Sequence, residues 1–194
     1  NFIKRQNKFI AISVGRMVNI KCFNVSILSF NEFYKSLKSS ERKNIELLIV
    51  GSGPLQTNLK NLASSLVCKN KIKFIDWIDQ KDLFEIYKKA SVMLVPSQEG
   101  AGAVVAEGMS FGLPILCFNN FGAGELVNKN CGYKISNSLS FDDSCKMMAN
   151  KLEIIYENAN IRSKMSKSAL HYFNENLSWD KKGENLLKIY NEFF

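Results

Sequence analysis

Residues 91–118 read SVMLVPSQEGAGAVVAEGMSFGLPILCF, which is an apolar run, a loop of small residues, a helix-like stretch and a second apolar run. Apolar runs of roughly four to six residues without polar alternation are typical of strands buried on both faces. A strand, a helix over 103–111 and a further strand in this order predict two parallel strands joined by a right-handed crossover. The stretch therefore predicts one unit of an α/β fold.

The same rhythm extends toward the start of the chain. Apolar runs at 8–15, 45–51 and 71–76 alternate there with helix-like segments at 21–37, 55–67 and 82–90. From Phe141 onward the spacing of apolar residues is helical only, which predicts two or three closing helices. We therefore expect a Rossmann-like, doubly wound parallel sheet with helices on both faces and C-terminal helices, as a single domain over residues 1–194.

Bulk composition narrows the class of protein. The chain has 194 residues, 46% of them hydrophobic and 23% charged, as in soluble globular proteins, and its apolar runs are too short for a bilayer span. Five cysteines without paired spacing predict free thiols in the cytoplasm rather than disulfides or a metal cluster. The single histidine, His171, argues against a histidine-based catalytic dyad. Because the first residue is Asn1 rather than Met, we expect a piece of a longer protein.

The net charge of +8 is unevenly distributed. Residues 1–90 carry 16 basic and 7 acidic groups, whereas residues 91–194 carry 10 and 11. A basic half is suited to nucleic acid, to an anionic membrane surface or to the phosphates of a small ligand. Solvated lysines on helix surfaces explain the same excess, and the charge alone does not separate these interpretations.

Ligands bind such sheets beyond the carboxyl ends of the strands, so the loops after the apolar runs are candidate sites. The first run is followed by Gly15-Arg16, with Lys21 at the expected start of the next helix. The guanidinium offers a two-pronged donor and the ammonium a point charge, and both are suited to a diphosphate. Two surface cations at this spacing are also common, so the pair is a hypothesis.

The next two loops contain glycines and an aromatic ring. Gly51 and Gly53 frame a turn in which the backbone can approach a ligand closely, although the third glycine of a dinucleotide fingerprint is absent. Trp77 and Ile78 follow the third run and would suit a flat base. A tight turn into a helix, and a core or rim position for Trp77, are the alternatives.

The fourth loop combines two carboxylates with small residues. Gly100, Ala101, Gly102 and Ala103 leave a helix N-terminus open to an anion such as pyrophosphate. Glu99 and Glu107 flank this stretch and can accept hydrogen bonds from sugar and ribose hydroxyls, while nearby cations offset their charge beside a phosphate. Alternatively, Glu99 caps the helix and Glu107 simply faces solvent.

The neighbouring motifs favour the ligand hypothesis. A Glu, a small loop, a second Glu after seven intervening residues and a Gly-Leu-Pro occur here as Glu99, 100–102, Glu107 and 112–114. With the Gly-Arg and Lys pair, the Gly-x-Gly-Pro turn at 51–54 and Gly-Glu-Leu-Val at 124–127, the chain resembles the C-terminal, donor-binding domain of group 1 retaining glycosyltransferases with the GT-B fold. The likeness covers nearly the whole chain.

The resemblance implies a role for each matching residue. Arg16 and Lys21 would hold the diphosphate, Glu107 the ribose, and Glu99 with the backbone of 100–102 the transferred sugar, while the base would lie near Gly53 and Ile78. Ala101 stands where the family usually has a larger residue, Asp76 replaces a common Gly, and Gly108 replaces a common Ala. These departures leave the sugar and the base undetermined.

The implied reaction transfers a hexosyl group, with retention, from a nucleoside diphosphate sugar to a saccharide or lipid-linked saccharide in cell-surface polysaccharide or glycolipid synthesis. No metal or other cofactor is expected. The acceptor would bind an N-terminal domain that these residues lack, so we expect the chain alone to be inactive. We expect the protein to lie in the cytoplasm, with peripheral contact with the inner face of an anionic membrane as an option. We expect no nucleic-acid partner. The rival hypothesis is a basic α/β binding module for nucleic acid or an anionic membrane surface, without catalysis.

Overall fold

A six-stranded parallel sheet forms the centre of the computed structural model, which describes residues 8–100, 102–120 and 122–193. The strand order is β3-β2-β1-β4-β5-β6. The strands are β1 (Phe9–Val14), β2 (Ile45–Val50), β3 (Ile72–Ile75), β4 (Val92–Val95), β5 (Ile115–Phe118) and β6 (Gly132–Ile135). The order reverses between β1 and β4, so this Rossmann-like sheet has its switch point, where ligands bind, at the carboxyl ends of those two strands.

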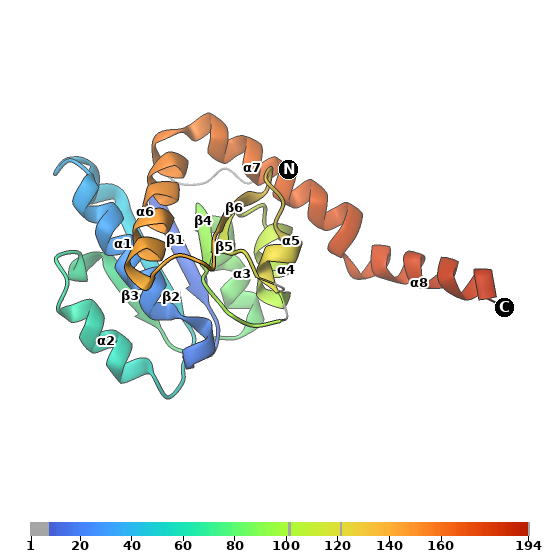
Figure 1. Cartoon of the computed structure of the whole chain (residues 1–194), viewed down its shortest axis with the longest axis horizontal. Helices are drawn as coiled ribbons and strands as arrows, with labels where there is room; N and C mark the ends of the chain where they lie inside the picture. The colour runs from blue at the N-terminus through green and yellow to red at the C-terminus, as the bar shows by residue number, and fades with distance from the viewer. Residues whose placement is uncertain (1–7, 101, 121, 194) are drawn as a thin grey trace.

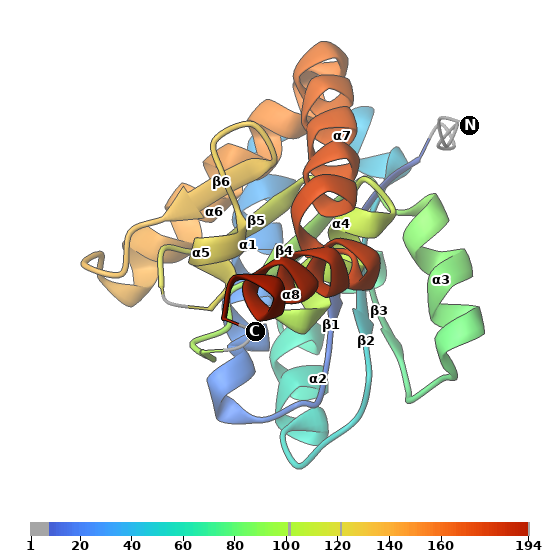
Figure 2. The ribbon, with the colours of Figure 1, turned by 90° about the vertical axis from the view of Figure 1, so that its right-hand side faces the viewer.

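Helices cover both faces of the sheet (Figure 1). One face carries α1 (Phe23–Ser36), α2 (Gln56–Ser64) and α6 (Phe141–Glu157), and the other carries α3 (Gln80–Lys89), α4 (Ala103–Ser110) and α5 (Ala123–Leu126). The helix α7 (Ala159–Tyr172) contributes Met165 to the first core and Ala169 to the second. Figure 2 shows α7 and α4 on the near side of the sheet, with α1 and α6 behind it. The expected doubly wound architecture is therefore confirmed.

Alternation along the strands explains the two hydrophobic cores. In β1, Phe9 and Ala11 point into one core and Ile10 and Ile12 into the other. Successive side chains of a strand point to opposite faces, so a strand buried on both sides must be apolar at each position. This is why the apolar runs in the sequence located these strands.

The short turns and the last helix complete the chain. The turns are η1 (Asn19–Lys21), η2 (Glu41–Asn44), η3 (Lys69–Lys71) and the π-helical turn η4 (Phe173–Leu177). The last helix, α8 (Trp179–Phe193), extends away from the sheet and buries none of its described side chains (Figure 1). Within the described ranges, no helix is both long enough and apolar enough to cross a lipid bilayer.

Three local expectations need correction. The strand β6 was not predicted, because it contains no continuous apolar run. At its centre Tyr133 is half-buried and Lys134 is exposed, as suits an edge strand. Lys21 does not begin a helix: it ends η1, and α1 starts at Phe23 after Cys22 takes a left-handed conformation. The helix expected over 55–67 is shorter, because α2 spans Gln56–Ser64.

Candidate functional site

The loops after β1 and β4 meet at the switch point of the sheet. The two strands pair in parallel, so both loops leave the same edge. The Gln98 N–H donates to the Ile20 carbonyl at 2.9 Å, which holds the β4 loop against η1. This contact brings Lys21, next to Ile20, toward Glu99, next to Gln98.

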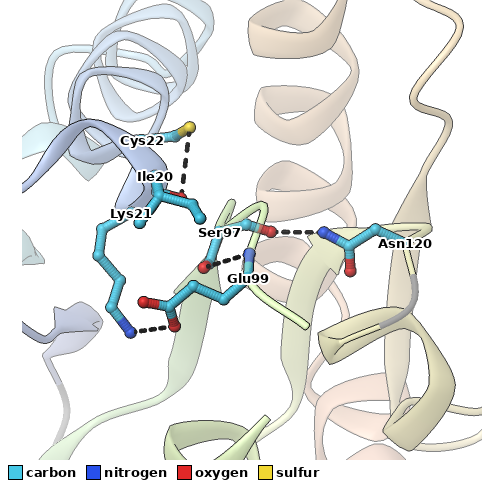
Figure 3. Close-up of polar contacts among 6 residues, drawn as sticks. All are labelled: Ile20, Lys21, Cys22, Ser97, Glu99 and Asn120. Carbon is cyan, nitrogen blue, oxygen red and sulfur yellow. Dashed lines mark hydrogen bonds and ion pairs between the residues drawn. The ribbon is translucent and has the colours of Figure 1, made fainter. Parts of the chain in front are cut away.

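Lys21 and Glu99 form an ion pair across this junction. The Lys21 Nζ lies 2.6 Å from Glu99 Oε2, with the two side chains 16% and 29% exposed (Figure 3). The lysine stem runs over Gly15, where a β-carbon would stand 3.2 Å from the Lys21 Cε. The glycine therefore leaves room for the lysine to reach Glu99. Two groups expected to bind different parts of a ligand thus contact each other.

A pocket of about 540 Å³ opens beside this pair, at the carboxyl ends of β1 and β2. Five residues predicted from the sequence line it: Gly15, Arg16, Gly51, Gly53 and Ile78. Trp77 also lines the pocket and is 75% exposed, so it is not a core residue. Arg16 is exposed, and no ion pair involves its guanidinium in the part of the chain that the structure describes. The pocket lining therefore combines the aromatic ring of Trp77 with the guanidinium of Arg16.

Glycine is required at the floor of this pocket. Gly51 has a φ of +125°, and a β-carbon there would stand 2.1 Å from the carbonyl oxygen of Gly15. The adjacent Ser52 carbonyl accepts a hydrogen bond of 2.9 Å from the Met17 N–H, which joins the two loops. Larger side chains would force these loops apart. The turn at 51–53 thus brings bare backbone to the edge of the pocket.

Glu107 has a different partner, which the sequence did not reveal. It lies in the second turn of α4 and is half-buried. The hydroxyl of Tyr87, from α3, donates to Glu107 Oε2 at 3.2 Å. Burial, and then the charge of Glu107, raise the pKa of Tyr87 far above its usual value, so the hydroxyl remains protonated. In the sequence, Leu83 and Tyr87 lie four residues apart, on one face of a helix. This spacing indicates that Tyr87 is buried but does not reveal its hydrogen bond.

The loop after β5 contacts the β4 loop and holds it in place. The Asn120 Nδ2 donates to the Ser97 carbonyl at 2.6 Å (Figure 3). A β-carbon at Gly122 would stand 1.9 Å from the carbonyl oxygen of Glu99. Sequence reasoning missed both residues, although their place after a buried strand is the signal that identifies loops at this edge. They fix the backbone that carries Glu99.

The remaining predicted residues lie at the start of α4. Gly100 is exposed, Gly102 is the N-cap, and Ala103 is the first helical residue. Ala101 lies outside the described residues. No group of three or more His, Cys, Asp or Glu side chains is arranged to hold a metal ion in the described ranges. A second pocket, of about 470 Å³, lies between the β4 loop and α6 and includes none of the predicted residues.

Comparison with known proteins identifies the family of the chain. A family model for group 1 glycosyl transferases matches residues 2–171. An uncharacterized glycosyltransferase of Haemophilus influenzae is 32% identical over 165 residues, which are 84% of this chain and 43% of that protein. The chain thus spans less than half the length of this relative.

Solved structures share the fold. WaaG, a glycosyltransferase involved in lipopolysaccharide biosynthesis, superposes with a TM-score of 0.78 at 23% identity, over 93% of this chain and 46% of WaaG. Anabaena Alr3699/HepE, solved with UDP and glucose, gives a TM-score of 0.79 at 16% identity, over 96% and 49% of the two chains. The fold matches the C-terminal domain of GT-B glycosyltransferases, which confirms the expected resemblance. The chain belongs to the group 1 family of glycosyltransferases.

Proposed function

We propose that the chain is the donor-binding domain of a retaining glycosyltransferase that uses a nucleoside diphosphate sugar. The observation that carries the proposal is the pocket beside the Lys21–Glu99 pair at the switch point. Its wall of Trp77 and Ile78 suits a flat base, and Arg16 with Lys21 suits a diphosphate. Structures of relatives with bound UDP support the same ligand class.

The proposed roles assign each part of the donor to different residues, of which Gly53, Ile78 and Arg16 line the pocket and Lys21, Glu99 and Glu107 do not. The base would lie between Gly53 and Ile78, and the ribose hydroxyls would donate to Glu107. Arg16 and Lys21 would stabilise the charge that grows on the diphosphate as the bond to the sugar breaks, without a metal ion. Glu99, once released from Lys21, would accept hydrogen bonds from the sugar hydroxyls.

In the proposed reaction, the bond between the anomeric carbon and the diphosphate oxygen breaks as the acceptor oxygen bonds to the same carbon. The acceptor attacks from the face that the diphosphate leaves, so its proton passes to the departing diphosphate oxygen and the anomeric configuration is retained. The acceptor, a saccharide or lipid-linked saccharide of the cell surface, would bind a second domain. The chain spans less than half of its relative, which supports such a domain, and the isolated chain should transfer negligible sugar.

Location in the cytoplasm is part of the proposal. All five cysteines are free thiols, and four of them are buried. Reduced cysteines of this kind are typical of a reducing compartment. A peripheral contact with an anionic membrane would bring the enzyme to a lipid-linked acceptor, and the exposed lysines are suited to that contact.

The charge distribution alone does not favour the rival binding module. Six lysines of the basic half, among them Lys8 and Lys73 on Glu46, pair with carboxylates. The excess basic charge that remains suits the phosphates of the proposed donor as well as it suits a polyanion. We expect no nucleic-acid partner.

Titration of the chain with a panel of nucleoside diphosphates and their sugars tests the proposal. We expect saturable binding of one nucleotide class, seen by calorimetry and as a rise in melting temperature, because a ligand selective for the fold stabilises it. Arg16→Ala, Lys21→Ala and Glu107→Ala should each weaken it. Binding only to nucleic acid or anionic vesicles, steeply salt-dependent and unchanged in Glu107→Ala, would support the rival instead.

A further inference from the structure

We propose that Tyr87 is a positioning residue for ribose recognition, because its buried hydroxyl fixes the carboxylate of Glu107 in the orientation that receives the ribose diol. This inference rests on the proposed donor site and adds a residue outside the motifs that suggested it. Tyr87 lies on α3, twenty positions before Glu107 in the sequence.

The ring of Tyr87 is held by packing. Its side chain is 0% exposed, and its ring lies 5.5 Å from the ring of Phe111, which in turn lies 4.9 Å from that of Phe84. A ring fixed in this way directs its hydroxyl to one place. That place is Glu107 Oε2, at 3.2 Å.

The backbone of Glu107 is also fixed. It lies within α4, and its carbonyl accepts a hydrogen bond of 2.6 Å from the Ser110 hydroxyl. The remaining freedom is the rotation of the carboxylate, and the Tyr87 hydroxyl limits that rotation. A carboxylate has about four acceptor positions, of which the phenol takes one. The others stay available, since no other side chain donates to the Glu107 carboxylate in the described residues.

A neutral donor suits this role better than a cation. A lysine or arginine at this point would offset the charge of Glu107 and weaken the hydrogen bonds that it accepts from hydroxyls. The phenol orients the carboxylate and leaves its negative charge in place. Burial keeps the hydroxyl protonated, as its raised pKa indicates, so it donates throughout the working pH range.

The helix that carries Tyr87 also forms part of the pocket. Leu83, one turn earlier on α3, lines the 540 Å³ pocket together with Ile78. The same helix therefore presents an apolar side chain to the proposed base site and a hydroxyl to Glu107. The position of α3 links the two parts of the nucleoside.

Removal of the hydroxyl alone, in Tyr87→Phe, tests the inference. Dissociation constants are measured by calorimetry for the nucleoside diphosphate that the wild-type chain binds and for its 2′-deoxy and 3′-deoxy forms. We expect the wild type to prefer the ribose form by about 10-fold or more, as for charge-assisted hydrogen bonds. Tyr87→Phe should bind the ribose form roughly 5-fold more weakly and a deoxy form as the wild type does.

Matched variants separate positioning from folding. Tyr156→Phe, on the opposite face of the sheet, should change neither dissociation constant. Glu107→Gln should remove the ribose preference, and Tyr87→Phe added to it should have no further effect on that preference. Equal weakening of ribose and deoxy binding in Tyr87→Phe, or complete loss of binding, would show a structural role and overturn the inference.

The two proposals fail in different ways. A wild-type chain without saturable nucleotide binding would overturn the donor site itself. A wild-type chain that binds with ribose preference, while Tyr87→Phe keeps that preference in full, would overturn only the role of Tyr87. A fall of the preference by roughly 5-fold in Tyr87→Phe, with deoxy binding unchanged, would establish it.

Discussion

Glu99 and Glu107 belong to the same short stretch of chain, but different kinds of partner hold them. Glu99 lies in the loop after β4 and pairs with the ammonium of Lys21 at 2.6 Å. Glu107 lies in α4 and accepts a hydrogen bond from the neutral hydroxyl of Tyr87 at 3.2 Å. A ligand that uses Lys21 must compete with Glu99, whereas a ligand that uses Glu107 finds its charge uncompensated. If the proposed donor site is right, the first region has to rearrange on binding, whereas the second is ready in advance.

The loop around Glu99 limits how far that rearrangement extends. Two hydrogen bonds hold the backbone that leads to Glu99: the Glu99 N–H donates to Ser97 Oγ at 3.2 Å, and Asn120 Nδ2 donates to the Ser97 carbonyl at 2.6 Å. The side chains of the pair can therefore separate while the loop stays in place. We expect donor binding to break one ion pair without unfolding the loop.

The largest effect should follow from Lys21→Ala. The change removes a cation proposed for the diphosphate and leaves the Glu99 carboxylate unpaired beside it. The lost charge-assisted contact corresponds to about 1.5 to 3 kcal/mol, or roughly a 10- to 150-fold rise in the dissociation constant for a nucleoside diphosphate. Calorimetric titration measures this rise.

The control for Lys21→Ala is an exposed lysine far from the pocket. Lys164 lies on α7, and Lys164→Ala lowers the net charge by the same amount. Its dissociation constant should equal that of the wild type. Equal weakening in both variants would mean that overall charge, rather than the position of Lys21, governs binding.

Glu99→Gln should have a smaller effect, of opposite sign for two ligands. Without the ion pair, Lys21 is free, so the affinity for a nucleoside diphosphate should rise about two- to fivefold, in keeping with a pair near the surface. The affinity for the matching nucleotide sugar should fall relative to the affinity for the nucleoside diphosphate, since Glu99 is proposed to hold the sugar. Parallel titrations with both ligands give the ratio.

Glu184→Gln provides the matched control. Glu184 pairs with Lys181 at 2.8 Å on the projecting helix α8, so the same chemical change occurs away from the pocket. It should leave both affinities unchanged. If Glu99→Gln binds the nucleoside diphosphate more weakly than the wild type, the ion pair does not compete with the ligand.

Much of the fold could be predicted from the sequence, because burial on both faces requires a strand to be apolar throughout. The runs that became β1, β2, β4 and β5 are such strands. Of the two edge strands, β3 was predicted although Lys73 within it is exposed, whereas β6 escaped detection. In β6 only Tyr133 and Ile135 are large apolar residues, so this strand lacks the continuous apolar run that marks the central strands.

The candidate site shows a similar limit. The carboxyl-end rule and the glycine turns predicted the pocket lining, including Arg16 and Ile78, because strand order decides which loops share an edge. The pairing of Lys21 with Glu99 joins residues 78 positions apart and depends on how far each side chain reaches. Tyr87 has the spacing of an ordinary core residue, so its sequence position did not reveal the hydrogen bond.

The smallest expected effects are on the free energy of unfolding. Measured without a ligand, they allow a comparison of the contacts that hold the two carboxylates. Tyr87→Phe removes a hydrogen bond at the edge of the core and should lower the free energy of unfolding by about 0.5 to 1.5 kcal/mol. Glu99→Gln breaks an ion pair whose partners are 16% and 29% exposed, but the amide that replaces the carboxylate can still accept a hydrogen bond from Lys21, which limits the loss. We expect a change between about 0 and 1 kcal/mol.

Urea denaturation of both variants and of the wild type measures the difference, with equal m-values as the test that the unfolded states are comparable. A larger loss in Tyr87→Phe than in Glu99→Gln would show that Glu107 is built into the folded core while Glu99 is held mainly for ligand exchange. The reverse order would mean that the Lys21–Glu99 pair is a structural contact. A donor could then separate that pair only at a cost in stability, and the competition proposed for the site would lose its physical basis.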